Sequence, residues 1–166
     1  MSPLDAEPID PAGSRAHPSP PPTLDDRYRR VRRASIALVA PLTFEDQGAQ
    51  SMPDASPTKW HLAHTAWFFE TFLLVPHLAD YQPFDRAFGY LFNSYYEALG
   101  ARHPRPARGL ITRPGGAEVL AYREHVDHAM ERLLGRSMPP QVADLVALGL
   151  AHEEQHQELI LMDILN

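Results

Sequence analysis

Two histidines, His152 and His156, lie inside an apolar helical pattern and limit the folds that this chain can adopt. Residues four apart lie one turn apart on the same face of a helix. That face points to the core, because residues at steps of three or four share it: Leu145, Gly149, His152, His156, Leu159 and Asp163. Burying two imidazoles without partners costs a few kcal/mol. The fold must therefore place opposite them either carboxylates or a shared metal ion, for which neutral imidazole is the commonest ligand.

Four segments carry an apolar stripe of helical period, and none carries the alternating pattern of a strand. The first spans residues 24–46, with Pro41 ending or kinking it, and the second begins at Ser56-Pro57, read as an N-cap and first-turn proline. The third and fourth span residues 116–135 and 139–166. These segments predict an all-α four-helix bundle, with a long ordered loop at residues 81–115 between the second and third helices.

The two ends of the chain carry separate expectations. Residues 1–22 contain seven prolines and few large apolar side chains, which predicts a disordered tail or, alternatively, a proline-rich docking peptide. Residues 23–166 then form one domain. The last helical pattern is still in period at Asn166, from which we expect a larger parent polypeptide.

Composition narrows the class of protein. The net charge of -6 argues against nucleic acid as a partner. No stretch approaches the roughly 18 consecutive apolar residues of a membrane helix, and no signal peptide is visible. The chain has no cysteine, which excludes disulfides and thiolate metal sites and is consistent with the cytoplasm.

A catalytic metal typically takes three protein ligands and keeps one position open, so a third ligand is expected from another helix. The second helix carries His61 and His64, of which His64 shares the aromatic stripe. We therefore predict His64 as the ligand and His61 as a residue behind the ligands or at the surface. Glu158 is predicted either to accept a hydrogen bond from a ligating imidazole or to pair with a neighbouring helix.

A second interpretation of the same residues stays open. The string HEEQH at residues 152–156 satisfies the zinc-protease pattern H-E-x-x-H, in which Glu153 would act as the base. Outside that interpretation, Glu153 and Glu154 are expected to face solvent.

Three strings of this chain resemble the N-terminal part of the sulfoxide synthases of ergothioneine biosynthesis. They are QSMPDASPTKWHLAHT at residues 50–65, FNSYYE at 92–97 with RGL at 108–110 and RP at 113–114, and LGLAHEEQHQEL at 148–159. They occur in the same order as in the family and are spread across most of residues 24–166.

The resemblance implies a DinB-like four-helix bundle that holds non-haem iron(II), Fe(II), through His64, His152 and His156. It implies O₂-dependent joining of a thiol sulfur to the imidazole of Nα-trimethylhistidine (hercynine), which gives a sulfoxide. It also implies that Gln155 positions hercynine and that Arg108 meets the carboxylate of the thiol substrate, with Arg105 and Arg113 as close neighbours.

Family members carry a further C-terminal domain similar to formylglycine-generating enzymes, which supplies a catalytic tyrosine and is not found in these residues. We therefore expect this chain to bind iron but not to turn over alone. Cysteine, γ-glutamylcysteine and a selenium analogue remain open as donors. Two alternatives are a stand-alone DinB-like thiol transferase that uses a divalent metal and an inactive truncated helical module.

Overall fold

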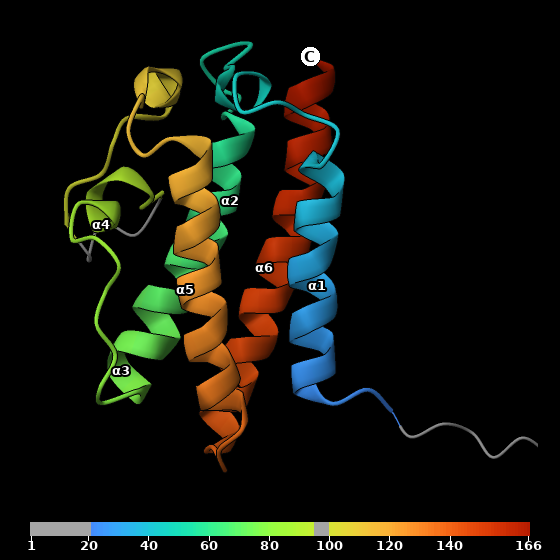
Figure 1. Cartoon of the computed structure of the whole chain (residues 1–166), viewed down its shortest axis with the longest axis vertical. Coiled ribbons are helices and arrows are strands. Elements are labelled where there is room, and N and C mark those ends of the chain that lie inside the picture. The colour runs from blue at the N-terminus through green and yellow to red at the C-terminus, as the bar shows by residue number, and fades with distance from the viewer. Residues whose placement is uncertain (1–20, 95–99) are drawn as a thin grey trace, which may run out of the picture.

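A computed structural model describes residues 21–94 and 100–166, and within these residues the protein is all-helical, without strands. Four long helices form a bundle: α1 (Leu24–Val39), α2 (Thr58–Phe69), α5 (Gly116–Leu134) and α6 (Pro140–Leu165). Figure 1 shows them side by side, and the most closely packed pairs are α1 with α6, α6 with α2, and α2 with α5. The predicted all-α bundle is confirmed. The predicted tail at residues 1–22 lies outside the described residues except for its last two positions.

Helix α1 begins with a capping box and ends just before a proline. The Thr23 hydroxyl accepts from the amide of Asp26, and the Asp26 carboxylate accepts from the amide of Thr23, which together form a capping box. The helix ends at Val39, two residues before Pro41, which has no amide hydrogen to continue it. The segment after it contains only a short 3₁₀ turn, η1 (Asp46–Gly48).

Helix α2 is buried on every side and forms the centre of the bundle. It begins one residue later than predicted, because Pro57 takes the N-cap position and Thr58 the first helical one. It then passes into a π-helical turn, η2 (Glu70–Leu74), and ends with α3 (Val75–His77). The Glu70 carboxylate at this turn accepts from the hydroxyls of Tyr81 at 2.5 Å and Tyr122 at 2.7 Å.

The described residues of the connection from α3 to α5, 78–94 and 100–115, form a loop with short turns, as expected. It contains α4 (Phe88–Leu91) and the 3₁₀ helix η4 (Arg105–Leu110); residues 95–97 of the second motif lie outside the described residues. Lys59 of α2 anchors the loop, since its ammonium donates to the carbonyls of Ile111 at 2.5 Å and Pro114 at 3.2 Å. The loop is thereby held over one side of α2.

A glycine lets α6 approach α2 closely. A Cβ at Gly149 would lie 2.7 Å from Cε1 of Phe69 and 3.0 Å from Cε1 of Phe68, so a larger residue would force the helices apart. About one and two turns further along α6, His152 and His156 face α2. No helix of the described residues is both long and apolar enough to cross a membrane.

Glu153 corrects a prediction, because it is fully buried rather than solvent-facing. Its carboxylate accepts from Arg32 of α1 at 2.9 Å, from Arg123 of α5 at 2.8 Å and from the Ser35 hydroxyl at 2.6 Å. Arg123 also donates to the Leu62 carbonyl of α2 at 2.9 Å. Helix α6 therefore buries two faces, one toward α2 with the histidines and one toward α1 and α5 with Glu153. Glu154 is exposed, as predicted.

Candidate metal centre

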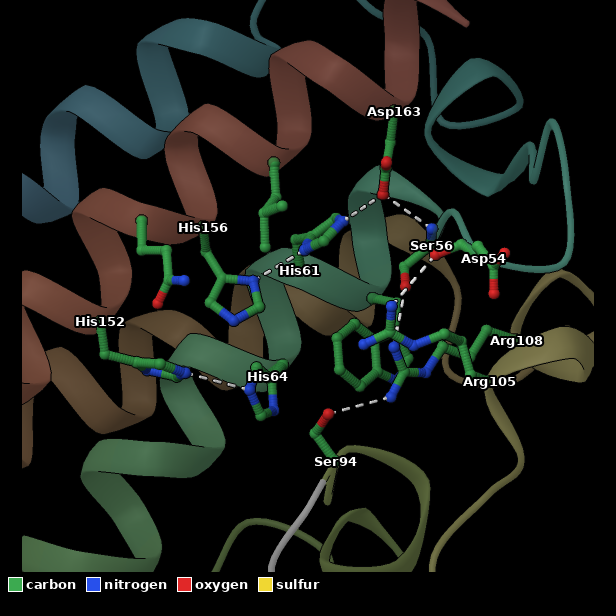
Figure 2. A pocket seen from close by; sticks show the side chains of 13 residues that line it. Asp54, Ser56, His61, His64, Ser94, Arg105, Arg108, His152, His156 and Asp163 are labelled. Carbon is green, nitrogen blue, oxygen red and sulfur yellow. Dashed lines mark hydrogen bonds and ion pairs between the residues drawn. The ribbon is translucent and has the colours of Figure 1, made fainter.

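Three histidines from two helices converge at one point (Figure 2). They are His64 of α2 and His152 and His156 of α6, and each offers a ring nitrogen within 4.8 Å of the others. Nε2 of His64 and Nε2 of His152 lie 3.2 Å apart. Because ligand atoms bound to one ion at about 2.1 Å lie roughly 3–4 Å apart, this spacing suits a shared metal ion.

The ring of His64 is oriented by three neighbours. Its Nδ1 donates to the Phe92 carbonyl at 2.6 Å, because a carbonyl can only accept. The ring is stacked between Trp60, with centroids 4.6 Å apart, and Trp67, at 5.4 Å. A neutral ring with its hydrogen on Nδ1 presents a lone pair at Nε2, which faces the other two histidines.

The rings of His152 and His156 are held differently. His152 packs against Phe68, with centroids 4.8 Å apart, and its Nδ1 is buried without a hydrogen-bond partner among the described residues. Nδ1 of His156 lies 2.8 Å from Nδ1 of His61, whose Nε2 lies 3.0 Å from the Asp163 carboxylate. His61 is thus buried directly behind a predicted ligand.

Burial keeps the three rings neutral at ordinary pH. It lowers the pKa of His152 from 6.5 to about 4. Burial, reinforced by the neighbouring histidines, lowers the pKa of His64 and of His156 well below 6.5. Neutral imidazoles with convergent lone pairs fit a divalent transition metal such as iron, zinc, copper or nickel, and they do not select among these ions.

The histidines form one wall of a cavity of about 530 Å³. The opposite wall is cationic, with Arg105 and Arg108 (Figure 2). The buried guanidinium of Arg108 lies 3.3 Å from the ring centroid of Trp60 and donates to the Ser56 hydroxyl at 2.8 Å. A small molecule in this cavity would contact both a metal at the histidines and the arginines.

Of the other predicted site residues, two line the cavity and one does not. Gln155 is exposed on α6 and lines the same cavity as Arg108, one residue before His156. Glu158 is exposed and is not among the described residues that line the cavity. The roles predicted for these three side chains stay predictions. The predictions did not include Asp54 and Ser56 in the lining, and nothing in their local sequence pattern indicated it.

Bundle and site together define a class of protein: an all-helical domain whose core-facing histidines can hold a metal ion beside an open cavity. The chain belongs to the DinB superfamily, whose family model matches residues 27–160. DinB-like domains are often metal-binding, in agreement with the histidine cluster. No curated protein matches the chain.

Proposed function

We propose that the chain is the iron-binding part of a non-haem iron(II) sulfoxide synthase that acts on hercynine, a thiol and O₂. The observation that carries the proposal is the convergence of His64, His152 and His156 on a cavity with an arginine wall. The resemblance of residues 50–65 and 148–159 to the sulfoxide synthases supports it, because those two strings supply all three histidines.

The reaction balances as a four-electron oxidation by O₂. A C–H bond of the hercynine imidazole and the S–H bond of the thiol break, and a C–S bond forms. One oxygen atom of O₂ becomes the sulfoxide oxygen, and the other leaves as water with both hydrogens. Bound iron(II) would supply the site at which O₂ is activated, since three protein ligands leave coordination positions open.

The remaining residues would bind and orient the substrates. Arg108 and Arg105 place positive charge on the wall opposite the histidines, which suits the carboxylate of an amino-acid thiol. Gln155 lines the cavity from α6, beside the histidines, and would position hercynine, whose imidazole must lie next to the thiol sulfur.

We also propose that a second domain, similar to formylglycine-generating enzymes, packs on this one and supplies the catalytic tyrosine. The last two turns of α6 expose apolar side chains suited to such a contact, among them Leu161, Met162 and Leu165. Solvent-exposed apolar clusters of this kind commonly mark interaction surfaces.

A second candidate is a thiol transferase that uses zinc. It is compatible with the site, because an all-imidazole set beside an open cavity suits zinc as well as iron. The two candidates differ in substrate, because a transferase has no use for hercynine or O₂.

Hercynine binding separates the candidates. We expect calorimetric titration under anaerobic conditions to show hercynine binding to the Fe(II)-loaded chain. Gln155→Ala should weaken this binding by about tenfold, since loss of one positioning hydrogen bond costs about 1.4 kcal/mol. Glu154→Ala, an exposed neighbour that is not among the described lining residues, serves as the matched control. Binding of a thiol but not of hercynine, to a zinc-loaded chain, would instead support the transferase.

A further inference from the structure

A chain of hydrogen-bonding groups extends from one metal-site histidine to the end of α6 (Figure 2). Nδ1 of His156 lies 2.8 Å from Nδ1 of His61, and Nε2 of His61 lies 3.0 Å from Oδ2 of Asp163. The same Oδ2 accepts from the backbone amide of Ser56 at 2.8 Å. His61 and His156 are 2% and 8% exposed, so bulk water does not replace these contacts.

The hydrogen positions along this series of hydrogen-bonding groups follow from its last group, the Asp163 carboxylate. An ionised carboxylate only accepts, and Asp163 already accepts from the amide of Ser56. Nε2 of His61 must therefore carry a hydrogen and donate to Asp163. Burial favours the neutral ring, so Nδ1 of His61 is then a bare acceptor. The hydrogen between the two facing Nδ1 atoms belongs to His156, and its Nε2 is left with a lone pair.

We propose that Asp163 and His61 are positioning residues that hold His156 in the tautomer with a free Nε2. Its Nε2 lone pair is thereby ready to bind a metal ion before the ion arrives. The proposal rests on metal binding by the three histidines, the first part of the proposed function, and not on the identity of the substrates. Carboxylate, imidazole and ligand then form an extended version of the pairing by which proteins orient metal-binding histidines.

The other two predicted ligands differ from His156 in what holds their Nδ1 atoms. His64 has its Nδ1 hydrogen held by a backbone carbonyl, that of Phe92, at 2.6 Å. His152 has no such partner for Nδ1 among the described residues. A backbone carbonyl cannot be removed by substitution, whereas His61 and Asp163 can. The position of His156 is therefore the one that side-chain variants can test.

The test is the affinity of the full chain for Co(II), measured by competition with a chelator. His61→Leu removes the acceptor for His156, and we expect about 10- to 100-fold weaker binding. His61→Asn places an amide oxygen where Nδ1 was, and we expect it to restore the affinity to within about threefold of wild type. His128→Leu changes an exposed histidine on α5 and should leave the affinity unchanged.

A spectroscopic readout separates positioning from a loss of fold. In the Co(II)-loaded chain, ring N–H protons of the ligands give NMR signals shifted by the metal. The signal of the His156 ring N–H should exchange slowly in wild type and His61→Asn, and should exchange fast or disappear in His61→Leu. Asp163→Ala, at a partly exposed position, should also weaken Co(II) binding. It replaces His61→Leu in the test if that variant does not fold.

Two results would overturn the proposal in different ways. Equal Co(II) affinity in wild type, His61→Leu and Asp163→Ala would refute the positioning role and leave the metal centre intact. Equally weak binding by the leucine and asparagine variants would show that an acceptor opposite Nδ1 of His156 is not what His61 contributes. Absence of Co(II) binding by wild type would instead refute the metal centre itself.

Discussion

Replacing Glu153 with alanine is expected to lower the free energy of unfolding by about 3–5 kcal/mol, because it leaves two buried guanidinium groups without their shared counter-ion. Burial alone would raise the pKa of Glu153, but Arg32, Arg123 and the Ser35 hydroxyl lower it to about 2. The carboxylate is thus charged and paired inside the bundle. Its loss removes links from α6 to both α1 and α5.

Urea denaturation of the metal-free chain would measure this effect. Glu154→Ala is the matched control, since Glu154 is the next residue on α6 and is exposed, and its effect should stay within about 0.5 kcal/mol. Glu153→Gln keeps a hydrogen-bond acceptor but not the charge, and we expect an intermediate loss. If Glu153→Ala were as stable as Glu154→Ala, the carboxylate would not stabilise the bundle.

Acidification of the metal-free chain is expected to have a comparably large effect. Burial lowers the pKa of His61, His64, His152 and His156 below 6.5 in the folded state, to about 4 for His152. The unfolded chain therefore binds more protons as pH falls through 6.5 toward 4. Folding stability must then decrease with falling pH in this window, by about 1.4 kcal/mol per pH unit for each histidine charged only when unfolded.

Denaturation at a series of pH values from about 7.5 to about 5 would test this prediction, and this range lies above the ordinary carboxylate pKa values. His152→Gln should reduce the slope by up to about 1.4 kcal/mol per pH unit. His128→Gln, at an exposed position, should leave the slope unchanged. A flat stability profile in wild type would mean that the cluster histidines titrate alike in the folded and unfolded chains.

The helical period of the apolar residues was enough to predict the helices, because each helix shows its pattern in its own stretch of sequence. The four helices were expected. The choice of His64 over His61 as a ligand stays a prediction, although the three predicted ligands lie close together. Asp163 was placed on the core face by the same pattern, but its pairing with His61 was not foreseen. That pairing depends on how close α6 lies to α2, which a single-helix pattern does not contain.

The wrong prediction for Glu153 has a related cause. A helix with one apolar stripe has one buried face, and a charged residue off that stripe is expected in solvent. Helix α6 instead packs on α2 with one face and on α1 with another, where Arg123 of α5 also reaches Glu153. The charges that compensate Glu153 come from Arg32 and Arg123, which are distant in sequence. The π turn at Glu70–Leu74 could not be predicted from the sequence either, because it lies within an otherwise regular helical period.

The most direct test of the metal centre is the iron content of the chain after anaerobic equilibrium dialysis against Fe(II). Three convergent imidazoles predict about one ion per wild-type chain and close to none in His64→Ala, His152→Ala or His156→Ala. His128→Ala should retain the wild-type content, because His128 is exposed on α5. Circular dichroism of each variant would confirm that the helices remain. Full iron content in folded His156→Ala would contradict the three-histidine centre and the function proposed from it.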